Sequence, residues 1–231
     1  RTVRAQAPLV AKKGDVVAVQ KQDKYGQRHS IPSWTELKKM AQAGYISQVL
    51  SEGDLIPIRL TNGEENTIRV TFDGKGKMFF IFENCLKDSM YMAASPKGWF
   101  TWASSDIRFY LEQKVYNKLI PEELALAIAL TEIPEKLPNG KIEVSDNFLF
   151  LPSEGQVFGF SNNRGRPDSQ LRCFADRENR RKTFADGVAA SWWTRAIKNE
   201  GAAVLLVDKP GTRLYANPSD LRGIAPCFCI L

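Results

Sequence analysis

Histidine occurs once in the 231 residues, as His29, and this scarcity limits the catalytic chemistry open to the chain. Serine and cysteine hydrolases use a histidine base, and zinc or iron sites built on imidazoles need several histidines. In any of these designs His29 would have to serve alone. It lies in a polar stretch, where a solvated side chain is the simpler interpretation. Most familiar catalytic designs are therefore excluded, and we expect a protein that is not an enzyme.

The cysteines lack the spacing of a metal or redox motif. Zinc ribbons and redox motifs need pairs of cysteines separated by two residues, and this chain has no such pair. Two of its cysteines flank Phe228 in a predicted strand, so both would point to one face of the sheet and Phe228 to the other. We interpret all four as buried free thiols, which suits a reducing cytosol, and expect no metal and no cofactor. The four are Cys85, Cys173, Cys227 and Cys229.

Basic residues exceed acidic ones by 32 to 26, which gives a net charge of +6 and raises the question of a nucleic-acid partner. The excess is divided between residues 1–30 and residues 161–182. Acidic residues interrupt the second run, and no nucleic-acid motif accompanies it. We therefore expect two attachment surfaces, with a solvated loop or protein interface at 161–182, and do not favour nucleic acid as a partner. The basic residues of the second run are Arg164, Arg166, Arg172, Arg177, Arg180, Arg181 and Lys182.

Trp192 and Trp193 form the densest aromatic feature of the C-terminal half. Aromatic side chains can bind sugars or bases, but they belong more often to a core. Neighbouring residues of a strand point to opposite faces of the sheet. We therefore assign Trp192 to the core and leave two positions open for Trp193, in the core or on a ligand-binding surface.

The elements that must position these residues begin with a helix and a meander. Residues 1–32 are predicted to be a basic arm with one possible strand at Asp15–Val19, too poor in apolar residues to fold alone. Ser33 and Glu36 have capping-box spacing, which predicts a helix over residues 34–43. An antiparallel meander is expected next, with strands over Leu55–Leu60, Thr67–Phe72 and Lys77–Phe82.

The second half is predicted to combine a helical region with short strands. Apolar spacing after Ser104 or Ser105 and again after Pro121 predicts two helices that are separated near residues 119–121. Beyond residue 131, short strands joined by long ordered loops are expected, at Phe148–Leu151, Ala203–Val207 and Ile224–Ile230. Because no linker separates the halves, we predict one α+β domain over residues 33–231, with two or three helices and short antiparallel strands.

The order of motifs resembles a family of unknown function that is carried widely by bacterial prophages. The resemblance covers about residues 33–231. The ending is also similar to the C-type-lectin fold of formylglycine-generating enzymes and of the variable ligand-binding proteins of diversity-generating retroelements. The motifs are Ser33–Leu37 with Gly53-Asp54, Trp102–Leu111, Phe150–Glu154 with Val157–Gly159, Trp192–Arg195 and Arg222–Ile230.

This resemblance implies a C-type-lectin-like domain with a displayed, loop-rich surface. Trp192 and Ala225–Ile230 would be scaffold, while Lys198–Glu200 and Lys209–Asn217 would be displayed. The paired cysteines and metal chemistry of the formylglycine enzymes do not carry over, because Cys227 and Cys229 belong to the closing strand. The predicted ligand-binding residues are Trp193, Asn199, Lys209, Arg213, Tyr215 and Asn217.

Together these observations predict a non-enzymatic virion protein of a phage or prophage, on the tail or capsid surface and made in the bacterial host cytoplasm. Its loops would attach to a host cell-surface ligand, and its arm would dock on other virion proteins in a homo-oligomeric assembly. A structural decoration or connector subunit is the alternative, and an enzyme on a lectin-like scaffold is a further one. No apolar run approaches the roughly 18 residues of a membrane span, so no membrane partner is expected.

Overall fold

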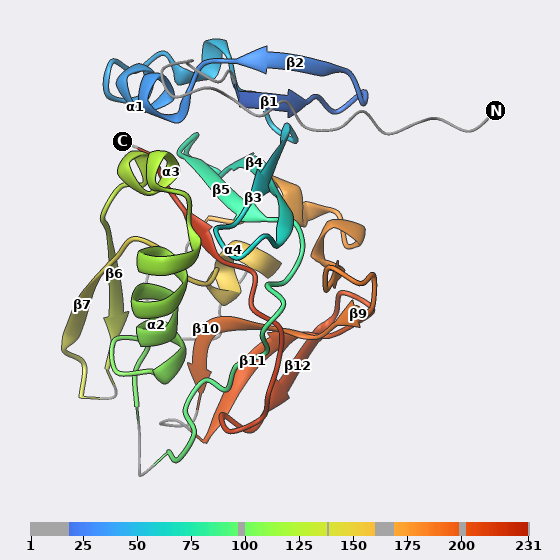
Figure 1. Cartoon of the computed structure of the whole chain (residues 1–231). Helices are drawn as coiled ribbons and strands as arrows, with labels where there is room; N and C mark the ends of the chain where they lie inside the picture. The colour runs from blue at the N-terminus through green and yellow to red at the C-terminus, as the bar shows by residue number, and fades with distance from the viewer. Residues whose placement is uncertain (1–18, 97–99, 138, 160–168, 199–201, 231) are drawn as a thin grey trace.

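A central antiparallel sheet is built around the predicted meander (Figure 1). This computed structural model of the protein describes residues 19–96, 100–137, 139–159, 169–198 and 202–230. The register of the meander places Val70 opposite Phe80, and both side chains are buried. The predicted meander is therefore confirmed. Its strands are β3 (Leu55–Arg59), β4 (Glu65–Phe72) and β5 (Met78–Phe82).

Segments from both ends of the described chain form the edges of this sheet. At one edge, the short strand β13 (Cys227–Phe228) pairs with β5. At the other edge, the hairpin of β1 (Val19–Gln22) and β2 (Arg28–Ile31) adjoins β3 through Gln22 and Leu55. The strand order is therefore β13-β5-β4-β3-β1-β2.

The β1–β2 hairpin falls within the range that the sequence predicts as an arm. The possible strand at Asp15–Val19 lies outside the described residues except for Val19, where β1 begins. A polar hairpin of this length is marginal alone, but the edge of β3 supplies it with a neighbouring strand. Residues 19–31 are thus part of the folded sheet and not of an arm, and the remaining predicted arm residues 1–18 lie outside the described residues.

The helices before residue 128 begin where the sequence predicts. α1 (Trp34–Gln42) follows a capping box in which Ser33 Oγ accepts from the backbone N–H of Glu36, and Glu36 Oε2 accepts from that of Ser33 at 3.1 Å. α1 packs against α3 (Glu122–Ala127). Between them, α2 (Asp106–Tyr110) continues directly as the π-helix η2 (Leu111–Leu119). The predicted helical regions are confirmed, whereas the π-helical winding is not visible in apolar spacing.

One short helix of the second half is missing from the sequence prediction. α4 (Glu154–Phe158) is a five-residue helix, too short to show helical periodicity. Its signal is a second capping box, in which Ser153 and Gln156 exchange hydrogen bonds. Single turns of 3-10 helix occur at η1 (Ile46–Gln48), η3 (Arg172–Ala175) and η4 (Glu178–Arg180).

The second half forms three small antiparallel sheets. One contains β10 (Trp192–Lys198), β11 (Ala203–Val207) and β12 (Arg213–Ala216). The others are the pairs β6 (Thr131–Lys136) with β7 (Ile142–Asn147), and β8 (Lys182–Thr183) with β9 (Ala189–Ala190). Strand pairing in the predicted strand Ile224–Ile230 is confined to β13 and isolated bridges, and Phe148–Leu151 contributes one bridge, from Phe150 to Cys227. Both predicted strands are therefore too long, because most of these apolar residues are buried in loops that do not pair as strands.

The core is continuous from the central sheet to the β10–β12 sheet. Phe228 of β13 stacks on Phe80 of β5 with ring centroids 5.2 Å apart, and Phe174 contacts Trp192 of β10 at 5.8 Å. The two sheets therefore share one hydrophobic core. The structure combines helices with antiparallel strands, which is the predicted α+β class. Among the described residues, no helix has the length and apolar character needed to cross a membrane.

Candidate functional site

A cluster of two cations around one aromatic ring lies on the β10–β12 sheet. Arg213 and Tyr215 are two residues apart in β12, so their side chains share a face of the sheet. The Arg213 guanidinium lies 5.3 Å from the centroid of the Tyr215 ring and also bonds to the Tyr215 hydroxyl. Lys198, at the end of β10, places its Nζ 4.2 Å from the same centroid. We call Lys198, Arg213 and Tyr215 the Tyr215 cluster.

A buried carboxylate holds this cluster in place. Glu154, the first residue of α4, has a side chain that is only 1% exposed, and it forms an ion pair with Arg213, whose side chain is 22% exposed. Arg195 of β10 reaches the same helix, and its Nη1 lies 2.7 Å from both Leu151 O and Gln156 Oε1. Because a buried charge is stable only with its partners in place, the two arginines bind α4 to the sheet and fix the orientation of Arg213.

The structure brings together only two of the six predicted ligand-binding residues, Arg213 and Tyr215. Lys209 is exposed in the turn between β11 and β12, whereas Asn217 is exposed beyond the other end of β12. The Asn217 side chain accepts hydrogen bonds from the backbone and hydroxyl of Ser219, which is a turn-forming role. Asn199 lies outside the described residues. Lys198 was expected to be displayed but was not among the six.

Trp193 lies in the core, one of the two positions left open for it, and its prediction as a ligand-binding residue is wrong. Both Trp192 and Trp193 are fully buried, because both faces of β10 are covered at this end of the strand. Trp193 donates its indole N–H to Met90 O at 2.9 Å, and Trp192 donates to Arg180 O at 2.9 Å. With its single donor satisfied inside the protein, Trp193 supports the sheet and offers no surface to a ligand.

Three basic residues of the run at 161–182 make contacts that hold distant segments together, whereas Arg172 and Arg181 are exposed. Arg164 and Arg166 lie outside the described residues. Arg177 and Arg180 donate to the backbone carbonyls of Pro210 and Phe174, at 2.8 and 2.7 Å. Lys182 is buried, with its ammonium bonded to Phe82 O and Glu83 O at 2.7 and 3.0 Å. A solvated loop is therefore the wrong interpretation for Lys182, which joins β8 to the end of β5.

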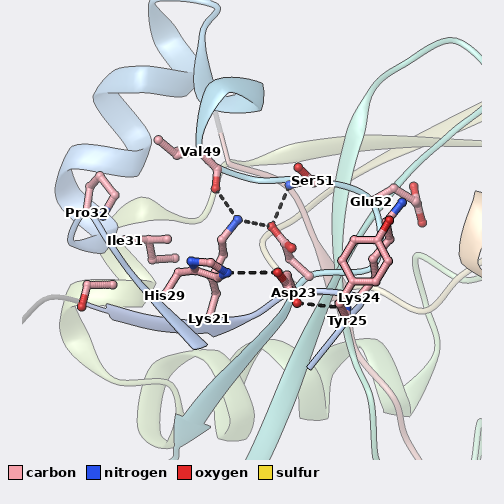
Figure 2. A pocket seen from close by; sticks show the side chains of 12 residues that line it. Lys21, Asp23, Lys24, Tyr25, His29, Ile31, Pro32, Val49, Ser51 and Glu52 are labelled. Carbon is pink, nitrogen blue, oxygen red and sulfur yellow. Dashed lines mark hydrogen bonds and ion pairs between the residues drawn. The ribbon is translucent and has the colours of Figure 1, made fainter. Parts of the chain in front are cut away.

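A pocket of about 530 Å³ lies between the β1–β2 hairpin and the segment before β3 (Figure 2). Lys21 of β1 closes it from one side, and Figure 2 shows its ammonium pointing toward the Val49 carbonyl. The Lys21 Nζ lies 2.8 Å from Val49 O and 2.7 Å from the buried carboxylate of Asp54. Asp54 also accepts from the backbone N–H of Ser51 at 2.8 Å. These bonds attach the hairpin to the sheet.

The single histidine lies in this pocket and contacts a carboxylate. His29 Nε2 is 3.0 Å from Asp23 Oδ2, and hydrogen bonding, first to His29 and then to the backbone N–H of Gln27, lowers the pKa of Asp23. Ser30 lines the same pocket, and its hydroxyl accepts a hydrogen bond from Gln20 at 2.9 Å. The pair can bind a proton, but among the described residues no serine or cysteine side chain bonds to His29 as an activated nucleophile would.

The sequence indicates the turn of the hairpin that lines this pocket, but not the pairing of its two strands. In the register of β1 and β2, Lys21 lies directly opposite His29, and the turn between them needs Gly26 at a φ of 83°. The Asp23–Gly26 turn is visible in sequence, but the pairing partner of a polar strand is not.

The cysteines are buried and free, as predicted. Burial raises the pKa of Cys85 to about 12 and that of Cys173 to about 11, so neither is a thiolate at neutral pH. Over the described ranges, no three histidine, cysteine or acidic side chains converge in the way a metal site requires.

Comparison with known proteins identifies a family but no characterised relative. Neither the curated proteins nor the solved structures include a match to the chain. The predicted membership of a family of unknown function is confirmed, although the match begins at residue 75 instead of residue 33. The model of a family described as "Domain of unknown function (DUF6273)" matches residues 75–231, more than half of the chain, and the protein therefore belongs to this family.

Proposed function

We propose that the protein is a non-enzymatic virion component of a phage or prophage, with a C-type-lectin-like domain that binds a ligand on the host cell surface. The observation that carries this proposal is the Tyr215 cluster. The resemblance to the C-type-lectin fold implies that Lys198, Arg213 and Tyr215 belong to displayed stretches, and in the structure Lys198 and Arg213 both contact the Tyr215 ring. A binding face needs such rigid, convergent groups, whereas dispersed surface charges bind little.

The chemistry of the cluster favours an anionic glycan as the ligand. Lys198 provides positive charge for a carboxylate or phosphate, and Arg213, whose charge Glu154 balances, offers the donors of a planar guanidinium suited to such groups. The Tyr215 ring adds an apolar surface for a sugar. Because Glu154 and the Tyr215 hydroxyl already orient Arg213, little conformational entropy is lost when a ligand binds.

The test measures binding of the purified protein to an immobilised uronic-acid polysaccharide and to neutral dextran. Lys198→Ala and Tyr215→Phe each remove one group of the cluster, and we expect each to weaken binding to the acidic polymer about tenfold. Arg213→Lys is preferred to Arg213→Ala, because alanine would remove the positive charge that Arg213 brings to the buried Glu154 carboxylate.

Lys209→Ala is the matched control, since Lys209 is exposed near the same strand but outside the cluster. It should bind almost as the unaltered protein does. Equal losses for Lys198→Ala and Lys209→Ala would indicate attraction by net charge and would contradict a built binding face. Binding of dextran and of the acidic polymer with equal affinity would contradict the anionic ligand.

A structural decoration or connector subunit is the competing proposal, and the N-terminal strands favour it. The hairpin β1–β2 precedes the family match and forms one edge of the central sheet, where a neighbouring subunit would attach. If Lys198→Ala and Tyr215→Phe left host adsorption unchanged while deletion of residues 1–18 prevented incorporation into particles, the connector role would be correct. Deletion to residue 18 spares Lys21 and its ion pair with Asp54.

An enzyme on a lectin-like scaffold is the third proposal, and the pocket of Figure 2 is the feature that favours it. It holds the His29–Asp23 pair, whose imidazole is 45% exposed and reachable by a substrate. Catalysis there would depend on the imidazole, so His29→Gln would abolish it. A turnover assay on host glycans that detects no product dependent on His29 would contradict this proposal.

A further inference from the structure

Two glutamates face each other on the inner side of the β6–β7 hairpin. The register places Glu135 of β6 directly opposite Glu143 of β7, in line with the buried side chains of Ile133 and Ser145. Side chains that are directly opposite in an antiparallel pair have Cβ atoms about 4.5–5.5 Å apart, and like charges in this position destabilise the pair. A second acidic pair, Glu132 and Asp146, lies opposite on the exposed side of the same hairpin.

The hydrogen bonds of the inner pair leave one oxygen without a partner. Glu135 Oε2 accepts the backbone N–H of Trp102 at 2.7 Å. Glu143 Oε2 is shielded from solvent, yet it has no hydrogen-bond partner within the part of the chain that the structure describes. An ionised oxygen buried in this way is costly, because it has lost its water and gained no donor.

A proton between the two carboxyl groups accounts for both observations. We propose that Glu135 carries a proton in the folded protein and donates it from Oε1 to Glu143 Oε2, which makes the β6–β7 hairpin a pH-sensitive element of the fold. Glu135 Oε2 then remains a carbonyl oxygen that still accepts from Trp102. The proton removes the repulsion between two anions and supplies the missing donor.

The charges around Glu135 are consistent with this assignment. Burial raises the pKa of Glu135, and the facing carboxylate of Glu143 raises it further. The Trp102 N–H and the positive charge of Arg195 act in the opposite direction, but the net pKa remains above the ordinary value. Arg195 donates to two uncharged oxygens, Leu151 O and Gln156 Oε1, and its positive charge lowers the pKa of Glu135 less than burial raises it.

The sign of the pH effect follows from this raised pKa. Below about 4.5, the ordinary value for glutamate, Glu135 is protonated in both the open and the closed hairpin. Above it, the closed hairpin keeps a proton that the open hairpin loses. The opening constant therefore rises about tenfold per pH unit until the pH passes the folded-state pKa of Glu135, and is constant beyond it. The closed hairpin is therefore most stable at acidic pH.

Hydrogen–deuterium exchange of the full chain tests this directly. We expect the opening constant of residues 131–147, corrected for intrinsic exchange rates, to rise with pH in the unaltered protein. In Glu135→Gln the amide replaces the shared proton, since its Nε2 donates to Glu143 and its Oε1 accepts from Trp102. The opening constant of this variant should therefore be flat between pH 5 and 8, within about twofold, as it lacks the titrating group.

Two further variants keep the test decisive. Glu143→Gln, which donates to Glu135 from the other strand, should flatten the profile as well and replaces Glu135→Gln if that variant is unstable. Asp146→Asn changes the exposed acidic pair and should leave the pH dependence intact. A flat profile in the unaltered protein, or the same flattening in Asp146→Asn, would overturn the shared proton.

Discussion

Single charged side chains join segments that are far apart in this chain. Lys182, which is 3% exposed, bonds to the carbonyls of Phe82 and Glu83 about a hundred residues earlier. Lys21 binds the buried Asp54 in a similar way and attaches the β1–β2 hairpin. In both cases the charge is buried together with its acceptors, so it contributes to the position of an element more than to solubility.

Replacing Lys21 by methionine should lower the free energy of unfolding by about 3 kcal/mol, because the Asp54 carboxylate would remain buried without its counter-charge. Urea denaturation followed by tryptophan fluorescence measures this loss. Lys24→Met is the control, since Lys24 is an exposed lysine of the same hairpin, and a change below about 0.5 kcal/mol is expected. Similar stabilities for the two variants would show that the ion pair contributes nothing.

The types and spacing of residues predicted part of the site, but the rest depends on contacts between residues that are far apart in the sequence. The i, i+2 spacing of Arg213 and Tyr215 is enough to place them on one face of a strand. Their anchor, Glu154, lies 59 residues earlier (213 − 154), beyond the reach of any local pattern. Trp193 shows the same limit: alternation separates it from Trp192, but only the segment at Met90 determines that its face is covered.

Elements with strong local signals were predicted well, and those held by tertiary contacts were not. α1 has a capping box and apolar spacing, and the meander has clear turns, so both match the structure. β6 contains Pro134 and alternates with acidic residues, which hides it among loop sequences. It is a strand because β7 pairs with it through six residue pairs.

Two turn glycines allow the cost of backbone strain to be separated from that of a steric clash. Gly187 and Gly211 have φ values of 82° and 80°, but a Cβ on Gly187 would meet nothing within 4 Å, whereas one on Gly211 would lie 2.8 Å from Arg177 O. We expect Gly187→Ala to cost about 1 kcal/mol of stability and Gly211→Ala about 3 kcal/mol. Equal losses in urea denaturation would refute the close approach at the β11–β12 turn.

At the scale of the whole molecule, the family match begins inside the central sheet, at residue 75. Residues 75–231 include β5 and β13 but not β4, which pairs with β5 through five residue pairs. The remainder of the sheet, with buried residues such as Ile56, Ile68 and Val70, comes from the segment before residue 75. The N-terminal strands therefore complete the core of this protein, and sequence composition, which marks them only as strands, does not reveal that dependence.

A fragment of residues 75–231 should aggregate or fail to fold cooperatively, because β5 would keep β13 but lose β4 and expose an apolar edge. Size-exclusion chromatography and thermal unfolding of the fragment beside residues 19–231 would test this. A monomeric fragment with a sharp unfolding transition would show that the family domain is independent of the strands that precede it.

The arrangement of the sheet also determines how the molecule would respond to a pulling force. The hairpin β1–β2 joins β3 through a single registered pair, Gln22 with Leu55, while β3, β4 and β5 are joined by five pairs at each interface. Tension applied at residue 19 would therefore break the Lys21–Asp54 contact and peel the hairpin away before it loaded the inner strands. Once detached, the hairpin would lengthen the N-terminal segment that carries the load. The β10–β12 sheet with its Tyr215 cluster would keep its shape.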